Sequence, residues 1–415
     1  MTNLNNINMK KPAILLSVLS SLLISCNTTQ QQKGSIIEID VTQSYPQKEI
    51  LLSEIASIKY VQLDDNNEEY LFNGYPLTFT ENNIVVFNQA TGDILFFDHQ
   101  GKPKSKFNHK GSGPNEYQMI SHAVYMEQTD ELYTLFRNKI QVYSSTGEHK
   151  RTLTLPTKAF ITEIMGIDKN RLLVYDNSRK YSLALGQLNS MSGIDTPQNS
   201  PKKEDILPAA YACISTEDGR VVNTIDIPED PTVSLSVAFE QGEIKGVTPG
   251  KCNRMVRYNE GLLLRNQETD TAYYYNLQTM ETTPAYIQLP SVKSLSPMVY
   301  VNNLVQADKY DFIEIYTLRI AQPGKLESKY LVRDRESDTT YEPKILFDEI
   351  KGKTGEISPS ITAKSTIPGM GVITLSYNEL QEAKGNNLLS GELKRMVDSM
   401  GTNENDVYMF LFFNK

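Results

Sequence analysis

The chain has 415 residues, and its 41 Lys and Arg against 50 Asp and Glu give a formal net charge of −9 at pH 7. A diffuse acidic balance argues against a nucleic-acid-binding protein, which needs a basic surface. Three cysteines are too few for the disulfide framework of a small secreted scaffold.

The N-terminal segment has the layout of a secretory signal peptide. Lys10 and Lys11 precede an apolar stretch, residues 13–24, which is shorter than the ~20 residues that span a bilayer. The stretch ends in Leu-Ile-Ser before Cys26, which resembles the lipobox of bacterial lipoproteins, whose peptidase cuts before a cysteine that carries a diacylglycerol. An ordinary signal peptide beside a chance cysteine is the alternative. Met9 is a better start than Met1, because residues 1–8 add nothing that a signal peptide needs.

This order predicts a lipoprotein signal peptide over residues 1–25, lipidation of Cys26 and a flexible tether over 26–37. Removing the signal peptide deletes two lysines and changes the formal charge from −9 to −11. Surface-displayed lipoproteins of some Gram-negative gut bacteria carry acidic residues just after the cysteine. Here the first acidic residue after Cys26 is Glu38, which favours a periplasm-facing protein, on the outer membrane rather than the inner.

Two cysteines remain beyond the lipidation site. Cys213 and Cys252 either form a disulfide in an oxidising periplasm or stay as two separate buried thiols. The spacing does not decide between them.

Past the tether, short β-branched and aromatic runs alternate with Gly, Asn and Asp turns. Residues 83–107 and 131–155 each predict strand, turn, strand, turn, strand. The two segments align at an offset of 46 to 48 residues, with Ile84 on Leu132, Ile94 on Ile140, Gly101 on Gly147 and Phe107 on Leu153. Matching strand triplets under fifty residues apart are typical of β-propeller blades.

Later segments follow the same pattern more loosely. A third unit spans 171–177 and 211–227 around a polar insertion at 188–208, a fourth spans 261–289 and a fifth 310–343. Residues 55–64 and 406–415 are strand-like without a local partner, and pairing them would complete a sixth unit and remove an exposed sheet edge. We therefore predict an all-β fold over 38–415: one six-bladed β-propeller whose N- and C-terminal strands close one blade.

One short C-terminal helix is predicted over residues 390–401. Leu393, Met396, Val397 and Met400 recur at helical spacing, with Ser390 as N-cap. We expect its apolar stripe to cover one end of the ring, and a partner-binding helix is the alternative.

The stretch Gly-Ser-Gly-Pro-Asn-Glu-Tyr, residues 111–117, resembles the GxGPxEY hallmark of six-bladed propeller lipoproteins abundant in gut Bacteroidetes. These are distant relatives of NHL- and TolB-type propellers, and most are domains of unknown function. Residues 268–289, 335–350 and 403–413 resemble later segments of the same family, so the resemblance covers roughly residues 40–415. Family members usually have Asn-Pro before the last strand, where this chain has Asn405-Asp406.

The glycine motif fits a turn better than a phosphate loop. The residues after Tyr117 soon become a strand, whereas phosphate binding needs a helix N-terminus there. We expect Gly111 and Gly113 to adopt backbone angles that other residues resist, and Pro114 to fix the next turn. Glu116 and Tyr117 then bond to backbone between two blades. A rim role, with both side chains contacting a ligand at the central channel, is the alternative.

The motifs of metal and nucleophilic sites are missing from the sequence. The four histidines have no ligand-like spacing; His99 and His149 fall at outer turns, in solvent, and only His109 and His122 are weak metal candidates. No GxSxG elbow occurs, and no cofactor is indicated.

These observations predict a lipid-anchored, periplasm-facing propeller, more consistent with a binding or scaffolding protein than with an enzyme. A glycan, a peptide or an envelope protein is the expected partner, at the mouth of the central channel where loops of several blades meet. The alternative is a propeller enzyme of the lactonase, lyase or hydrolase type at the same mouth.

Overall fold

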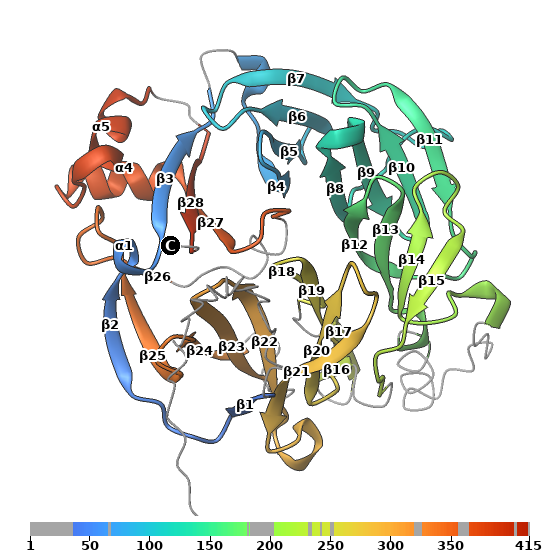
Figure 1. Cartoon of the computed structure of the whole chain (residues 1–415). Coiled ribbons are helices and arrows are strands. Elements are labelled where there is room, and N and C mark those ends of the chain that lie inside the picture. The colour runs from blue at the N-terminus through green and yellow to red at the C-terminus, as the bar shows by residue number, and fades with distance from the viewer. Residues whose placement is uncertain are drawn as a thin grey trace, which may run out of the picture. The chain divides into compact units, whose positions relative to one another are not determined.

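Six sheets stand around a central axis as the blades of a propeller (Figure 1). The computed structural model describes residues 36–64, 68–180, 182, 203–230, 235–240, 243–249, 253–318, 326–355, 365–401 and 405–413. The predicted signal peptide, Cys26, most of the tether and Cys252 lie outside these residues. The predicted six-bladed fold is confirmed.

The first three blades have four strands each, with the first strand in sequence nearest the axis (Figure 1). Blade 1 contains β4 (Gly74–Phe79), β5 (Ile84–Asn88), β6 (Asp93–Phe97) and β7 (Pro103–Asn108); blade 2 contains β8 (His122–Met126), β9 (Glu131–Phe136), β10 (Lys139–Tyr143) and β11 (His149–Thr154); blade 3 contains β12 (Ile161–Asp168), β13 (Arg171–Asp176), β14 (Tyr211–Ser215) and β15 (Val221–Ile225). A separate hairpin of β16 (Leu235–Glu240) and β17 (Glu243–Pro249), not expected from the sequence, follows blade 3.

The next two blades each gain an outer strand from the N-terminal segment, in parallel pairing. Blade 4 contains β18 (Met255–Tyr258), β19 (Gly261–Arg265), β20 (Thr271–Asn276), β21 (Thr282–Leu289) and β1 (Ile37–Asp40); blade 5 contains β22 (Val299–Gln306), β23 (Tyr310–Leu318), β24 (Leu326–Asp334), β25 (Thr339–Leu346), β2 (Gln47–Leu51) and the short β26 (Thr354–Gly355). The strand β1 begins at Ile37, the last residue assigned above to the tether.

Blade 6 closes the ring from both ends of the chain. It contains β27 (Met370–Leu375), β28 (Val407–Phe412) and β3 (Ser57–Gln62). The antiparallel register places Tyr408 opposite Val61 and Phe410 opposite Lys59. The expected pairing of the two end strands is confirmed. Phe410 is buried and meets Phe79 of blade 1 edge to face, with ring centroids 5.5 Å apart.

The aligned glycines of the outer turns show how neighbouring blades pack. Gly101, Gly147 and Gly219 all have a positive φ, between 79° and 90°, that favours glycine. Each lies against the outer strand of the preceding blade. A Cβ on Gly147, for example, would lie 2.5 Å from the Cβ of Phe107 in blade 1. The glycine thus allows both the turn and the close contact between blades.

Helices α1 (Leu52–Ile55), α4 (Tyr377–Gly385) and α5 (Gly391–Ser399) lie beside the outer strand of blade 6 (Figure 1). The 3-10 turns η1 (Glu68–Tyr70), η2 (Glu127–Thr129), η3 (Lys203–Asp205) and η5 (Val292–Ser294) are in other connections of the chain. No helix in the described residues is long and apolar enough to cross a membrane.

The predicted helix exists as α5, but it packs beside blades 5 and 6 rather than over an end of the ring. Leu393 and Val397 are fully buried in a cluster with side chains of β2, β3 and β25. The Ser390 side chain does not cap the helix. The carboxylate of Glu349 does so instead, accepting from the amides of Glu392 at 3.0 Å and Leu393 at 2.7 Å.

The closing strand offers a test of this architecture. We expect Phe410→Ala to lower the free energy of unfolding by about 3–5 kcal/mol, because it removes a buried ring from the contact between blades 6 and 1. Guanidinium denaturation measures the change. Lys59→Ala, at the exposed partner position on β3, is the control and should change the value by less than about 0.5 kcal/mol. A loss below ~1 kcal/mol in Phe410→Ala would contradict the role given to this strand.

Candidate functional site

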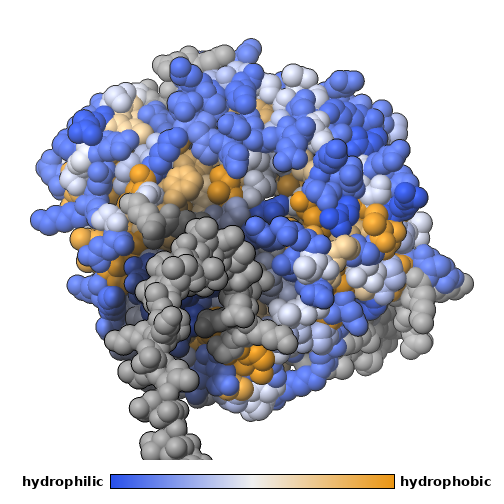
Figure 2. Space-filling view, viewed as in Figure 1, coloured by the Kyte–Doolittle hydropathy of each residue, from blue (hydrophilic) through white to orange (hydrophobic). Residues whose placement is uncertain are grey.

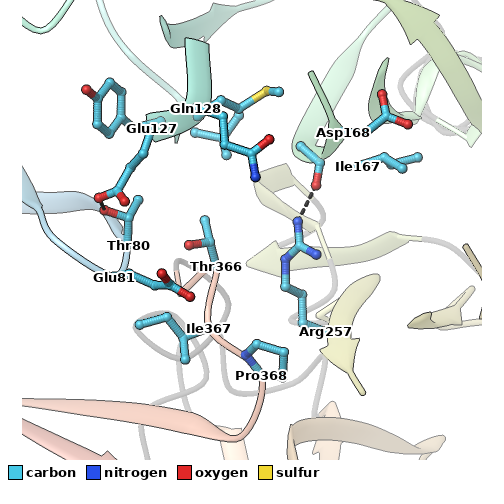
Figure 3. Close-up of a pocket in the computed structure, with 14 residues that line it drawn as sticks. Thr80, Glu81, Glu127, Gln128, Ile167, Asp168, Arg257, Thr366, Ile367 and Pro368 are labelled. Atoms are coloured by element: carbon cyan, nitrogen blue, oxygen red, sulfur yellow. Dashed lines mark hydrogen bonds between the residues drawn. The ribbon is translucent and has the colours of Figure 1, made fainter. Parts of the chain in front are cut away.

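A pocket of about 250 Å³ lies at one mouth of the central channel (Figure 3). Its lining comes from the ends of the inner strands and the turns after them: Thr80 and Glu81 of blade 1, Val124–Gln128 of blade 2, Gly166–Asp168 of blade 3, Arg257 of blade 4, and Thr366–Pro368 before blade 6. Five of the six blades therefore contribute to one site, at the location expected from the fold.

The pocket is closed below by apolar side chains. Met165, Met255, Leu304 and Met370 are buried around a residual void of about 10 Å³ that shares Arg257 and Ile367 with the pocket. The described side chains therefore give the pocket an apolar floor. In the space-filling view, hydrophilic residues dominate the outer rim, and hydrophobic residues show toward the centre (Figure 2).

Glu127 holds the rim between blades 1 and 2. Its carboxylate accepts from the Thr80 hydroxyl, the Asn82 amide N–H and side chain, both at 2.9 Å, and the Asn83 side chain. Burial alone would raise the pKa of Glu127, but these donors lower it below its usual value. The carboxylate stays ionised and is committed to crosslinking the two turns.

A second carboxylate of the lining is also engaged. Asp168 pairs with Arg171 at 2.7 Å and accepts from the Asn170 amide at 2.9 Å. Burial opposes ionisation here too, and the bonds from Arg171 and Asn170 outweigh it, so that the pKa of Asp168 is lowered. On the opposite side, the Thr366 amide donates to the Phe79 carbonyl at 2.9 Å and joins the segment before β27 to blade 1.

Arg257 extends from β18 toward the pocket, where Gln128 lies on the far side (Figure 3). Its guanidinium donates to the Gly166 carbonyl. Burial lowers the pKa of Arg257, and no negative charge opposes the effect. Among the described residues, it supplies the one cation in the lining of the pocket.

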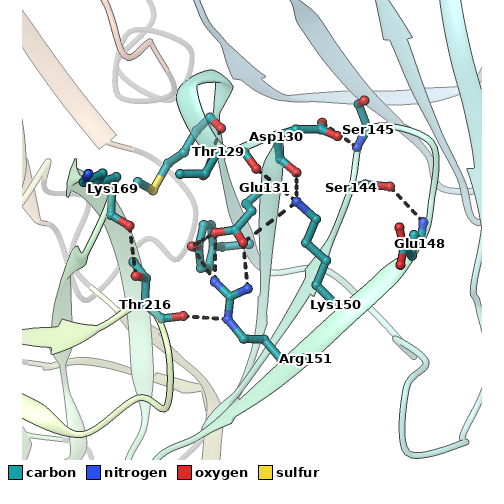
Figure 4. A network of polar contacts seen from close by, with 12 residues as sticks. Thr129, Asp130, Glu131, Ser144, Ser145, Glu148, Lys150, Arg151, Lys169 and Thr216 are labelled. Carbon is teal, nitrogen blue, oxygen red and sulfur yellow. Dashed lines mark hydrogen bonds and ion pairs between the residues drawn. The ribbon is translucent and has the colours of Figure 1, made fainter.

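A polar network braces the rim from outside (Figure 4). Arg151 donates two hydrogen bonds to the Glu131 carboxylate, at 2.6 and 2.8 Å, and one to the Thr216 carbonyl of blade 3, at 2.7 Å. Lys150 donates to the carbonyls of Thr129 and Asp130 at 3.0 and 2.7 Å. The turn that carries Gln128 into the pocket is thereby attached to the outer strand of its own blade and, through Arg151, to blade 3.

The glycine motif lies elsewhere. Residues 111–117 join β7 to β8 and line a separate pocket of about 240 Å³ beside the β9–β10 turn, so the structure does not bring them to the channel-mouth pocket. The expectation of unusual backbone angles was wrong, because neither Gly111 nor Gly113 has a positive φ. The glycines instead make room for Glu116, whose carboxylate accepts from the Gly113 amide at 2.7 Å. A Cβ on Gly111 would lie 2.0 Å from that carboxylate.

Tyr117 is buried between the two blades. Its hydroxyl donates to the Gly92 carbonyl at 2.7 Å and accepts from the His109 amide at 3.0 Å. It is therefore not exposed at a rim. Pro114 offers its carbonyl to Gln141 at 2.7 Å.

Three of the four histidines pack on aromatic rings, and His109 and His149 share the ring of Tyr143. His109 bonds the Gly147 carbonyl at 2.7 Å and stacks on Tyr143, while His122 begins β8. His99 and His149, expected in solvent, are half-buried, and His99 stacks on Phe410. In the described residues, no cluster of three or more His, Cys, Asp or Glu is placed to hold a metal ion. Cys213 is a buried free thiol.

The sequence pointed to the channel mouth but not to its residues. Glu81 and Gln128 follow the inner strands of aligned blades, so extending the 46–48 offset into the preceding turns would have located both. Arg257 had no such signal. It is one charged residue in the short strand Met-Val-Arg-Tyr, and only the ring brings it to the pocket.

The sequence of the chain matches the model of a known protein family. The model of the domain of unknown function DUF4934 matches residues 36–412. The chain belongs to this family. No curated protein matches. The resemblance to unknown-function propellers is thus confirmed.

One solved structure supports the fold of this DUF4934 propeller, and two others are less similar to it. The "Putative exported protein" of Bacteroides fragilis NCTC 9343 is 14% identical with a TM-score of 0.59, covering 92% of this chain and 100% of that one. A DUF4221 member from Bacteroides vulgatus is 13% identical with a TM-score of 0.42, over 86% and 96%. Virginiamycin B lyase from Staphylococcus aureus is 10% identical with a TM-score of 0.35, over 69% and 88%. The likeness to the Bacteroides fragilis protein, at 14% identity, establishes similarity of fold alone.

The network of Figure 4 gives a pH-dependent test. Burial would raise the pKa of Glu131, but the bonds from Arg151 and Tyr133 lower it. The stabilisation that ionised Glu131 gives the folded protein is therefore complete above its pKa in the unfolded chain, near 4.3. It is lost as pH falls through the pKa of Glu131 in the folded protein. We expect Glu131→Gln to lower the free energy of unfolding by about 1–2 kcal/mol at pH 7 and by less at pH 4.

Urea denaturation at the two pH values measures this difference. Glu148→Gln removes an exposed carboxylate from the same blade and should be neutral at both. Equal stability of Glu131→Gln and the unaltered protein at pH 7 would show that the network does not brace the rim.

Proposed function

We propose that this protein is a lipid-anchored component of the cell envelope, facing the periplasm, that binds a polar ligand at the channel mouth without transforming it. The ligand is a glycan or a peptide, presented free or by another envelope protein. The proposal is carried by one observation: a pocket of about 250 Å³ to which five blades contribute side chains. A pocket of this kind is the default binding site of a propeller.

The state of two of the three carboxylates in the lining favours binding over catalysis. A general acid needs a raised pKa, and a general base needs a carboxylate free to accept a proton. Glu127 and Asp168 have lowered pKa values and are already hydrogen-bonded within the rim. Both are therefore suited to shaping a pocket rather than to proton transfer.

Anchoring rests on the signal described from the sequence. Diacylation of Cys26 adds ~0.8 kcal/mol of membrane affinity for each buried CH₂, so two or three chains hold the propeller at a leaflet. The exported relative in Bacteroides fragilis agrees with this location.

The anchor is tested by replacing its acceptor. We expect the unaltered protein to sediment with membranes and to carry a lipid on Cys26 in the mass spectrum of its N-terminal peptide. Cys26→Ser should lose the lipid and remain uncleaved, because the lipoprotein peptidase acts on lipidated cysteine. Cys213→Ser, a change at a buried free thiol, is the control and should stay lipidated. An unlipidated mature N-terminus in the unaltered protein would refute the anchor.

The binding site is tested by filling the pocket. Host and dietary oligosaccharides and short peptides are screened for an increase in melting temperature, which a ligand of the folded state produces by mass action. We expect a ligand found in this way to have no effect on Gln128→Trp, whose side chain occupies the mouth. Gln118→Trp, an exposed position in the separate pocket, is the matched control and should respond normally. A ligand that still binds Gln128→Trp would place the site elsewhere.

A further inference from the structure

We propose that the channel-mouth pocket is specific for ligands that carry a carboxylate, which the guanidinium of Arg257 binds. This inference rests on the proposed binding function and names the chemistry of its ligand. The inference comes from an imbalance of charge in the pocket. The carboxylates of the lining are hydrogen-bonded or exposed to water, whereas the guanidinium of Arg257 is neither fully hydrogen-bonded nor fully exposed.

Arg257 is an incompletely paired charge. Among the described residues its guanidinium has one hydrogen-bond partner, the neutral carbonyl of Gly166, and no carboxylate. Its Nε atom is buried and has no hydrogen-bond partner. Buried guanidinium groups are normally paired with anions, because removing a charge from water without a partner is costly. The terminal N–H groups that do not bond to Gly166 are therefore available to a ligand in the pocket, whereas the buried Nε is not.

The acidic groups of the lining do not fill this role. Glu127 accepts bonds from the Thr80, Asn82 and Asn83 side chains and from the Asn82 backbone amide, and Asp168 is paired with Arg171. Glu81 is exposed, so water screens its charge. A cationic ligand would find two of the three carboxylates already engaged, whereas an anionic ligand would find an unpaired guanidinium.

A carboxylate fits this guanidinium better than other groups. Its two oxygens match the planar fork of Arg, and the resulting bonds are stronger than those between neutral groups. The volume of about 250 Å³ is below the range for drug-sized ligands, so the pocket suits a terminal unit rather than a long chain. The Gln128 and Thr366 side chains, also in the lining, can bond to neighbouring hydroxyl or amide groups. An acidic sugar and the C-terminus of a peptide share this chemistry.

Two matched pairs of probes distinguish the sources. Glucuronate is compared with glucose, and N-acetyl-Ala-Ala with its C-terminal amide, by isothermal titration of the full chain in detergent at millimolar ligand. We expect one acid of the two to bind about tenfold or more tightly than its neutral partner, the ratio that a charged hydrogen bond supplies. Arg257→Met, which keeps much of the apolar stem, should lose that preference. Arg257→Lys keeps the charge without the fork and should retain part of it.

The melting temperatures of both variants show whether they fold. If Arg257→Met does not fold, the inference is tested by Arg257→Lys and by the ratio of acid to neutral binding in the unaltered protein. Equal binding of acid and neutral probes, unchanged binding of the acid by folded Arg257→Met, or no binding of either acid overturns the inference. A neutral ligand that binds the unaltered protein and not Gln128→Trp would overturn it while leaving the proposed binding function intact.

Discussion

The structure depends on the ladder between β28 and β3, because a ring of blades has two exposed ends until it closes. The paired strands lie about 350 residues apart, and closing a loop of that length costs about 5 kcal/mol of chain entropy. The four consecutive side chains from Tyr408 to Leu411 are almost fully buried, and each contributes ~1.5–3 kcal/mol. Two further strands reinforce the closure: β1 joins blade 4 and β2 joins blade 5 before β3 reaches blade 6. The N-terminal segment therefore fastens three successive blades.

Features with a local or periodic signal were predictable from the sequence, and features that need distant partners were not. The 46-residue repeat located blades 1 and 2, and the unpaired end strands predicted the closure. The parallel strands β1 and β2 gave no signal, because their partners lie more than 240 residues away. Helix α4 was missed although Ser376 and Glu379 form a capping box, which the sequence does display. For the site, the fold indicated the mouth, but the lining is shared among five blades, and beyond the offset that relates Glu81 and Gln128 no spacing connects its residues.

The difference between local and distant constraints also explains why the glycine motif, the most conspicuous one in the sequence, is not the candidate site. The stretch 111–117 is rich in glycine because the carboxylate of Glu116 occupies the space where side chains would be, and Tyr117 fills the gap between blades 1 and 2. A dense motif reports a local constraint on the backbone. A propeller's binding site has no such constraint, since each blade needs to supply only one side chain at the end of one strand. The rim in turn needs crosslinks such as Glu127, which hold strand ends of separate blades in fixed positions.

The packing of the channel gives the pocket an apolar floor. Met165, Met255 and Met370 are buried around the small void below the pocket, so a ligand at this mouth meets apolar side chains there. Arg257 stands where that floor meets the polar rim, which explains why burial lowers its pKa although the group borders a pocket open to solvent. An electrostatic contact is stronger at such a boundary than in water, because the apolar side reduces screening. A single guanidinium in this position can therefore discriminate between ligands, where the same residue on the outer rim would add little.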